Sequence, residues 1–286
     1  MKQSLEINHE RIAFVAHIMK SLGLDFFKSL ELKDPQSRSI DILCKKHNKY
    51  TPLLACVNST ITYALSCKGE EYWDEFTQFM NAHELEPKYE TIIKLVMEFL
   101  YRSRCNKLRK VDKINRLRKL IKCSSLKQLL STPIMPKDLQ TILSQCLKTP
   151  KYSKTITFAI KMTYYSYRIC LGMDLELPLD IPIPVDRRVA LTTHVMDLIR
   201  VRDRMKLRKV IDLLLRNSKI IRCVWNDVAR LSDIPPLHID VFLWIIGRYI
   251  RECKNKDEVI NTVVSIVDPI YREKLKVFLN NLLVNL

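Results

Sequence analysis

The feature that most constrains this 286-residue sequence is the stretch Pro150–Arg188, in which proline and glycine mark off two helices. Ser153 is a good N-cap residue, and the run from Thr155 to Leu171 contains neither proline nor glycine. One glycine and three prolines then end this helix and hold an extended connection. Asp186 is the first residue after the prolines that can cap a new helix. The stretch therefore predicts two helices joined by a stiff linker.

Lys154 and Asp186 stand at the starts of these two predicted helices. Two helix N-termini that face one site would make a positively polarised pocket. A lysine and an aspartate in such a pocket suit an amine nucleophile and its carboxylate partner. The carboxylate can stabilise a sugar on which positive charge develops, and such charge develops when an N-glycosidic bond is cleaved. The alternative for Asp186 is a plain N-cap.

Composition predicts a helical protein. Glycine is rare, at 4 residues, and the sequence shows no sustained alternation of apolar and polar residues. Apolar residues make up 47%, which is enough to build a core. The expected fold class is therefore all-α, with many short helices. A run from Pro52 to Ser66 is apolar almost all round and predicts a central buried helix, and Arg187 to Arg200 predicts another helix.

Charge points to a polyanionic partner. Lys and Arg number 48 against 31 Asp and Glu, a net charge of +17, which favours nucleic acid first and an anionic membrane surface second. The run Arg102–Lys122 has apolar residues every three or four positions and predicts an amphipathic helix with a cationic outer face. A second basic run spans Arg200–Lys209. The alternative reading is a solvated face without a ligand.

The cysteines and the N-terminal residues bear on location and metal binding. The nine cysteines are scattered singly, with no C-x-x-C pair, which argues against a zinc finger or an iron–sulfur cluster. Neither a signal peptide nor a transmembrane run is expected. We therefore expect a cytoplasmic, nucleoid-associated protein without a metal, whose cysteines are reduced thiols. The alternative is that some of the cysteines form an internal disulfide, as occurs in proteins of thermophiles.

On the helix that follows Lys154, residues three or four apart share a face. Lys154, Phe158, Lys161 and Tyr165 fall on one side, which the pattern predicts to be exposed. An aromatic ring flanked by two lysines suits an anionic, planar ligand such as a nucleotide. The alternative is a solvated surface with an incidental phenylalanine.

Several strings together carry a resemblance to a known family. S-K-T at one helix start and P-V-D at the next resemble the helix-hairpin-helix DNA glycosylase superfamily. The fuller string K-T-x-x-F-A-x-K-M followed by I-P-I-P-V-D-R-R resembles one branch, the archaeal 8-oxoguanine DNA glycosylases (AGOG), which also have AP lyase activity. Three further matches follow that family's order: D-P-Q at 34–36, G-E-E-Y-W at 69–73 and D-V-F-L-W at 240–244. One departure is the hairpin P-K-Y-S, which has no glycine.

The resemblance implies a role for each matching residue. Lys154 would be the Schiff-base nucleophile and Asp186 its essential carboxylate. A flipped base needs two apolar or aromatic plates and a few contacts at its edge. Phe158 and Trp244 would be the plates. The residues expected at the polar edge of the base or in support of the pocket are Gln36, Trp73, Lys161 and Asp240. Taken singly, Trp73 and Trp244 could instead be core residues, Gln36 a turn residue and Asp240 an exposed helix charge.

The resemblance also implies an architecture and a reaction. We expect one domain over residues 1–286, built of two helical subdomains that flank an active-site cleft, with the helix-hairpin-helix element at about 138–171. The expected reaction is excision of 8-oxoguanine through a lysine Schiff base, followed by β-elimination, without a metal or organic cofactor. The partner would be damaged double- or single-stranded DNA and the protein a monomer. The alternatives are another damaged base or an abasic site as substrate, or a non-catalytic helical DNA-binding module.

Overall fold

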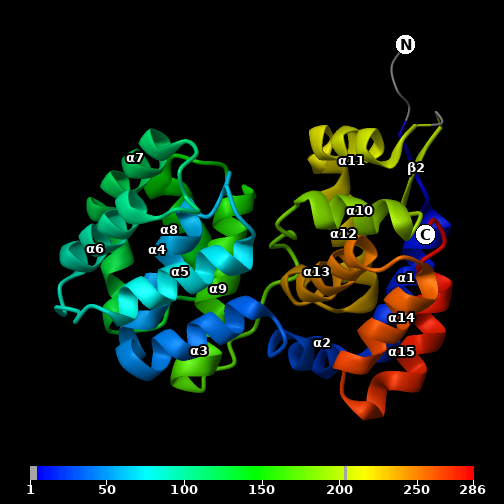
Figure 1. Cartoon of the computed structure of the whole chain (residues 1–286), viewed down its shortest axis with the longest axis horizontal. Coiled ribbons are helices and arrows are strands. Elements are labelled where there is room, and N and C mark those ends of the chain that lie inside the picture. The colour runs from blue at the N-terminus through cyan, green and yellow to red at the C-terminus, as the bar shows by residue number, and fades with distance from the viewer. Residues whose placement is uncertain (1–4, 203–204) are drawn as a thin grey trace. The chain divides into compact units, whose positions relative to one another are not determined.

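The computed structural model describes residues 5–202 and 205–286 (Figure 1). The chain divides into two compact units, one formed by residues 1–34 and 179–286 and the other by residues 35–178. We call them the terminal unit and the central unit. Within the described residues there are fifteen α-helices, two 3₁₀ helices and two short strands, which confirms the all-α fold class.

The central unit contains α3 to α9. Its longest helix, α9, packs against α3, α4 and α8. Every residue of α4 is buried, which confirms the predicted central helix. The helices of this unit are α3 (Pro35–His47), η1 (Asn48–Tyr50), α4 (Thr51–Ile61), α5 (Gly69–Asn81), α6 (Tyr89–Arg102), α7 (Lys110–Ile121), η2 (Ser124–Leu130), α8 (Pro136–Leu147) and α9 (Lys154–Leu171).

The terminal unit is assembled from both ends of the chain. Its helix α13 packs against α2, α10, α12 and α14, and α1 packs against α12 and α15. The elements of this unit are β1 (Leu5–Ile7), α1 (His9–Leu22), α2 (Leu24–Glu31), α10 (Arg187–Val195), β2 (Ile199–Val201), α11 (Leu207–Arg216), α12 (Ser218–Ser232), α13 (Pro236–Glu252), α14 (Lys256–Ile266) and α15 (Pro269–Leu282).

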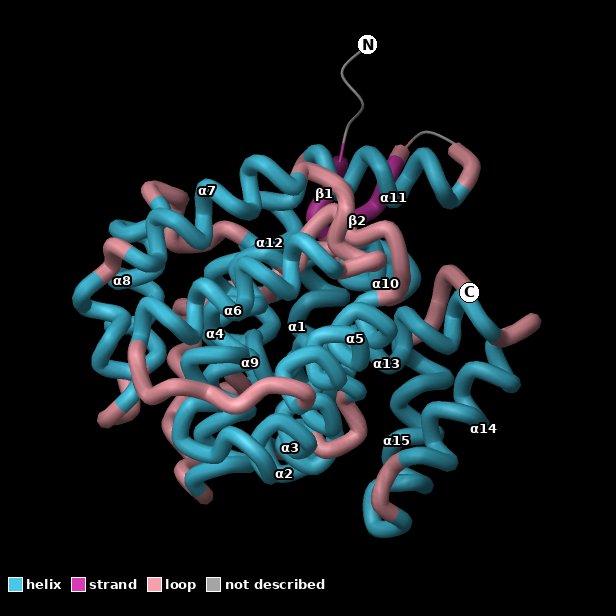
Figure 2. Tube along the Cα trace, turned by 60° about the vertical axis from the view of Figure 1, so that its left-hand side comes forward, coloured by secondary structure: helices cyan, strands magenta, loops and turns pink. Residues whose placement is uncertain are grey.

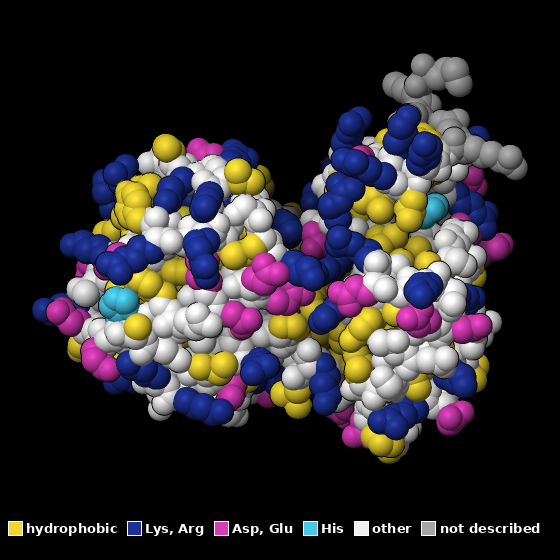
Figure 3. Space-filling model, in the orientation of Figure 1, with side chains coloured by type: hydrophobic (Ala, Val, Ile, Leu, Met, Phe, Trp, Pro, Cys, Tyr) yellow, Lys and Arg dark blue, Asp and Glu magenta, His cyan; other side chains and the backbone are white. Residues whose placement is uncertain are grey.

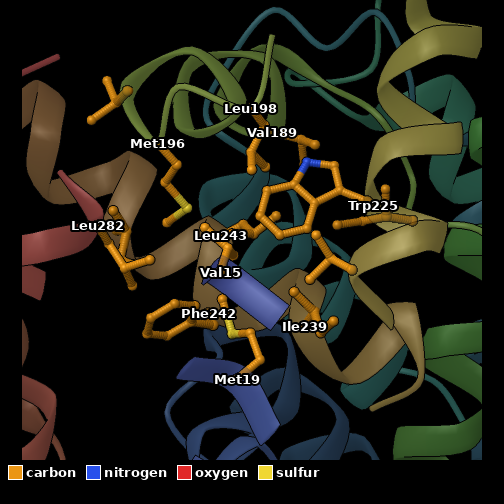
Figure 4. Close-up of a cluster of buried hydrophobic side chains, with 14 of the residues drawn as sticks. Val15, Met19, Val189, Met196, Leu198, Trp225, Ile239, Phe242, Leu243 and Leu282 are labelled. Carbon is orange, nitrogen blue, oxygen red and sulfur yellow. The ribbon is translucent and has the colours of Figure 1, made fainter. Parts of the chain in front are cut away.

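Large apolar side chains from both chain ends meet in the core of the terminal unit. Figure 4 shows Val15 and Met19 of α1 beside Trp225, Phe242 and residues that follow α10. Trp225 is fully buried, and its indole N–H donates to Thr193 Oγ1 at 2.8 Å. Each such side chain contributes about 1.5–3 kcal/mol on burial. This core fixes α13, which carries Asp240 and Trp244, and α10, whose N-cap is Asp186.

The prediction of a helix over Arg187–Arg200 is wrong at its end. Helix α10 stops at Val195, and Ile199–Val201 instead pairs with Leu5–Ile7 as an antiparallel two-stranded sheet, magenta in Figure 2. Pairing two segments almost two hundred residues apart leaves no local signal, so helical periodicity could not reveal it.

The basic run Arg102–Lys122 differs from the prediction in two respects. Arg102 is the last residue of α6, and the rest of the run is helical only over Lys110–Ile121, because the chain turns at Arg109, where φ is 53°. Lys113 does not lie on an outer face but is fully buried. Its ammonium group donates to Asn106 Oδ1 and lies 4.8 Å from the ring centroid of Tyr63. Burial and the nearby Arg109 charge lower the pKa of Lys113 to about 8.

The second basic run, Arg200–Lys209, is not one continuous helix. It begins in β2 and ends in α11, and residues 203 and 204 lie outside the described part. Arg200 pairs with Asp197 at 3.1 Å and Arg202 with Glu6 at 3.3 Å. Figure 3 shows many Lys and Arg side chains over the visible face, with Asp and Glu side chains interspersed.

Two disulfides in the central unit correct the expectation that the cysteines are reduced thiols. Cys67 is bonded to Cys105, and Cys123 to Cys146. Cys105 and Cys123 lie just before and just after α7, so the two bonds anchor both ends of this helix.

Among the described residues, no helix combines the length and the apolar character that crossing a bilayer requires.

Reduction is expected to destabilise the central unit. The two bonds close loops with sequence separations of 38 and 23, each worth about 3–4 kcal/mol in the chain-entropy account. Cys105→Ser and Cys123→Ser should therefore lower the melting temperature clearly, whereas Cys223→Ser, at an exposed free cysteine, should not. Thiol titration of the unfolded, unreduced protein should count the five free cysteines, and a count of nine would contradict the disulfides.

Candidate active site

The hairpin between α8 and α9 is held by its own backbone and by polar side chains of α8. Ser144 Oγ donates to the carbonyl of Thr149 at 2.7 Å, and Gln140 Nε2 donates to that of Lys151 at 3.3 Å. Lys148 adopts the left-handed conformation, with φ 52° and ψ 52°, at the C-cap of α8. The turn that a glycine usually makes is therefore made by Lys148, which explains how a hairpin without glycine can form.

Lys154 is the first residue of α9 and is exposed. Ser153 occupies the N-cap position as predicted, but its hydroxyl makes no capping bond. Its Oγ is buried and has no hydrogen-bond partner within the described chain. The Ser153 side chain therefore does not cap the helix start at which the predicted nucleophile lies.

Arg116 of α7 connects three segments around this helix start. Its guanidinium donates to the Thr60 carbonyl at 2.7 Å, to Thr155 Oγ1 at 2.9 Å and to Thr149 Oγ1 at 3.2 Å. It also lies 5.4 Å from the ring centroid of Tyr63. Burial lowers the pKa of Arg116 from its ordinary value. In the sequence Arg116 is only one member of a basic run, whereas in the structure its hydrogen bonds connect α7 to the hairpin and to α9.

The hairpin, the start of α9 and α7 line an open groove of about 820 Å³, which lies wholly in the central unit. Helix α7 forms one wall, and the hairpin with the start of α9 forms the other. The basic side chains exceed the acidic ones, since Asp112 is the one carboxylate among the groove residues. A groove of this charge suits a phosphate backbone. Its lining residues are Tyr63, Arg109, Asp112, Asn115, Arg116, Lys119, Leu147, Lys148, Thr149, Ser153, Lys154 and Thr155.

Phe158 and Trp73 lie together in the central unit. Their ring centroids are 6.4 Å apart in an edge-to-face arrangement, and Phe158 is half-buried. Trp73 is buried, with only 1% of its surface exposed. Its Nε1 has no hydrogen-bond partner within the described residues. Because a buried N–H without a partner costs about 1–3 kcal/mol, this donor is a natural point of contact for a ligand.

Lys161 and Tyr165 correct the prediction of an exposed lysine face on α9. They are 2% and 1% exposed, and the Lys161 ammonium lies 5.3 Å from the Tyr165 ring centroid. Gln36 is also buried, in the first turn of α3 rather than in a turn between helices. Buried polar groups of this kind are typical of binding sites, where they fix the orientation of a ligand.

Asp186 is the N-cap of α10, as predicted. Its Oδ1 accepts hydrogen bonds from the backbone N–H of Arg188 at 2.8 Å and of Val189 at 3.0 Å. The carboxyl group is half-buried. Both bonds fix the orientation of the carboxylate, so Asp186 serves as a cap whatever else it does.

Asp240 and Trp244 lie one turn apart on α13 and therefore share a face. Asp240 is 7% exposed, which excludes the alternative of an exposed helix charge. Trp244 is half-buried, with the guanidinium of Arg188 4.5 Å from its ring centroid. The terminal unit thus carries Asp186, Asp240 and Trp244, and the central unit carries Gln36, Trp73, Lys154, Phe158 and Lys161.

Comparison with known proteins decides the family. The family model described as "AGOG: N-glycosylase/DNA lyase" matches residues 16–279. The chain belongs to the AGOG family of N-glycosylase/DNA lyases. An N-glycosylase/DNA lyase of Pyrobaculum aerophilum is 30% identical over 256 residues, covering 88% of this chain and 92% of the relative. One from Methanococcus maripaludis is 28% identical over 258 residues, covering 87% and 94%.

A solved AGOG structure matches the fold as well. The crystal structure of the 8-oxoguanine DNA glycosylase Pa-AGOG from Pyrobaculum aerophilum, in complex with 8-oxoguanosine, aligns with a TM-score of 0.71 at 28% identity. The alignment covers 89% of this chain and 96% of that one. These matches confirm the family resemblance found in the sequence. The chain is a DNA N-glycosylase/lyase, and its substrate is DNA.

Sequence reasoning missed several residues around the AGOG site elements. Tyr63 and Thr149 lie in segments without a recognised motif, and only the structure brings them to Arg116. Gly247 did carry a signal, because it is one of only four glycines and stands inside a helix, where glycine needs a packing reason.

Proposed function

We propose that this AGOG protein excises 8-oxoguanine from DNA and then cleaves the strand as an AP lyase. The Lys154 amine attacks C1′ of the damaged nucleotide, and the C1′–N9 bond breaks as the base leaves. The attacking nitrogen loses a proton and the departing base gains one. The C1′–O4′ bond then breaks, O4′ takes the remaining nitrogen proton, and the opened sugar is joined to Lys154 as a Schiff base. β-Elimination then removes a C2′ proton and breaks the C3′–O bond, which releases the 3′ strand with its 5′ phosphate. This sequence of steps needs neither a metal nor an organic cofactor.

The observation that carries this proposal is the position of Lys154. It is exposed at the start of α9 and lines a groove that is rich in cations. A nucleophile at that point can reach a sugar whose flanking phosphates lie in the groove. Asp186, oriented by two backbone N–H groups, would supply the negative charge that stabilises an oxocarbenium-like centre.

The base would be held by the remaining site residues. Phe158 and Trp244 are the proposed plates, and Trp73 Nε1 is the proposed donor to the base edge, because it is buried without a partner among the described atoms. Gln36, Lys161 and Asp240, all buried polar side chains, would complete the polar contacts. The 8-oxoguanosine bound by Pa-AGOG supports this choice of base.

A single-turnover excision assay tests the proposed substrate. Duplexes that differ only in one base, 8-oxoguanine or guanine, should be cleaved in the first case and left intact in the second. A single-stranded oligonucleotide with the same lesion should also be a substrate, and a monomer should suffice for activity. Strand cleavage at an abasic site, without release of 8-oxoguanine from the damaged duplex, would favour the alternative, an AP lyase specialised for abasic DNA.

Lys148 offers a test of the groove. Lys148→Gly should raise the free energy of unfolding by about 1 kcal/mol, since glycine adopts the left-handed conformation without strain. It should also weaken binding to undamaged duplex and flatten its salt dependence, because one groove cation is lost. Lys148→Ala is the matched control and should weaken binding equally without the gain in stability. Duplex binding unchanged in both variants would exclude the groove as a phosphate site.

A further inference from the structure

Arg188 touches two proposed site residues of the terminal unit at once. Its backbone N–H donates to Asp186 Oδ1 at 2.8 Å. Its guanidinium carbon lies 4.5 Å from the centroid of the Trp244 ring. A guanidinium held against an indole is a favourable cation–π arrangement, and the planar group also limits how the ring can tilt. One residue therefore links the capping carboxylate of α10 to the aromatic ring on α13.

Gly247 allows this contact. It follows Trp244 by three residues on α13, where this helix lies close to Arg188 of α10. A Cβ atom at position 247 would lie 3.0 Å from Arg188 Cβ and 3.3 Å from both its Cα and its carbonyl oxygen. Two of these three neighbours are backbone atoms, which cannot turn aside as the end of a flexible side chain can. A residue with a Cβ atom at position 247 would therefore require Arg188 or α13 to shift by a few tenths of an ångström.

We propose that Arg188, admitted by Gly247, is a positioning residue that fixes the Trp244 ring relative to the Asp186 carboxylate. This inference rests on the proposed function, in which Trp244 stacks on the flipped oxidised purine and Asp186 stabilises the sugar. Stacking requires a defined ring plane, and the sugar must then arrive at the carboxylate. A ring fixed by Arg188 would meet both demands before DNA binds.

Arg187 provides a matched control. It is the neighbouring arginine in the first turn of α10, but its guanidinium pairs with Asp212 of α11 at 2.7 Å. Arg187→Gln and Arg188→Gln therefore remove the same charge from nearly the same place. Because both variants lose one positive charge, a difference between them is not caused by the general attraction of DNA.

The contact can be measured in the free protein. Of the three tryptophans, Trp73 and Trp225 are at most 1% exposed, whereas Trp244 is half-buried and dominates quenching by acrylamide. Arg188→Gln should raise the quenching constant because the ring loses the nearer of its two guanidinium neighbours, Arg188 at 4.5 Å and Arg248 at 5.8 Å, and Arg187→Gln should not. Adding Trp244→Phe to Arg188→Gln should abolish the increase. Equal quenching in the two arginine variants would overturn the inference.

Single-turnover excision measures the positioning itself. Relative to Arg187→Gln, Arg188→Gln should lose roughly 2- to 30-fold in discrimination between 8-oxoguanine and undamaged duplex. Arg188→Lys should not recover the wild-type value, because an ammonium lacks the planar face. Full recovery by lysine, or equal discrimination in both glutamine variants, would contradict the role. The proposed function is judged separately by whether the wild-type protein excises 8-oxoguanine, while quenching still decides the contact.

Gly247→Ala gives an independent check. Alanine is the better helix former, so helix propensity alone predicts a gain in stability. Crowding against Arg188 predicts the opposite, a lower melting temperature together with the loss of discrimination that is expected for Arg188→Gln. A more stable Gly247→Ala variant with wild-type excision would show that the close approach of α10 and α13 has no role.

Discussion

Lys154→Gln is expected to lose base excision and strand cleavage by roughly 10³- to 10⁶-fold, the scale that loss of a catalytic nucleophile can reach. Glutamine keeps a polar side chain, one atom shorter than that of lysine, but has no amine to attack C1′. Lys154 is exposed at the start of α9, so the melting temperature should stay close to that of the wild type. Single-turnover kinetics on 8-oxoguanine duplex measures the loss.

Lys151→Gln is the control for this prediction. Lys151 also lies in the hairpin and is exposed, and its ammonium donates to Thr141 Oγ1 at 3.2 Å, but it does not line the groove. Its removal should leave excision within a few-fold of wild type. Excision by Lys154→Gln at the rate of Lys151→Gln would mean that another amine is the nucleophile. Lys161 is the other lysine proposed for the site, and it would be the first candidate for that role although it is only 2% exposed.

Asp186→Asn should separate the cap from the catalytic charge. Asparagine caps a helix about as well as aspartate, so the two bonds from Arg188 and Val189 persist and stability changes little. A neutral amide cannot stabilise a cationic sugar, so excision should fall by about 10²- to 10³-fold. Binding to damaged duplex should be largely kept. Thermal melting and single-turnover excision on the same preparation measure the two effects.

Asp186→Ala completes the comparison. It removes the charge and the cap together, so it should lose excision like Asp186→Asn and also about 0.5–2 kcal/mol of stability. If Asp186→Asn excises 8-oxoguanine at the wild-type rate, Asp186 is only a cap. The proposed mechanism would then lack its carboxylate.

Local signals predicted the helix starts well. Proline, glycine and capping residues act within a few positions, so the starts of α9 at Lys154 and of α10 at Arg187 could be read directly from the sequence. The family resemblance, carried by short strings spread over more than two hundred residues, identified the fold class. No local rule gave the strand pairing of Leu5–Ile7 with Ile199–Val201.

Burial of charged residues was the weak point of the sequence reading. Periodicity assigns lysine to the outside, but Lys113 and Lys161 are buried, each beside a tyrosine ring. A buried lysine depends on partners that come from other segments, such as Asn106 for Lys113. The disulfide partners of Cys105 and Cys123 could not be predicted from the sequence either, because the spacing of cysteines does not specify their pairing.

Borohydride trapping on 8-oxoguanine duplex tests the central claim most directly. Reduction converts a Schiff base into a stable amine, so the wild-type protein should become covalently linked to the damaged strand. Peptide mapping should place the link on Lys154, and Asp186→Asn should give less adduct at early times. An undamaged duplex should give none. Absence of an adduct with the wild-type protein, or a link to a different lysine, would contradict the account.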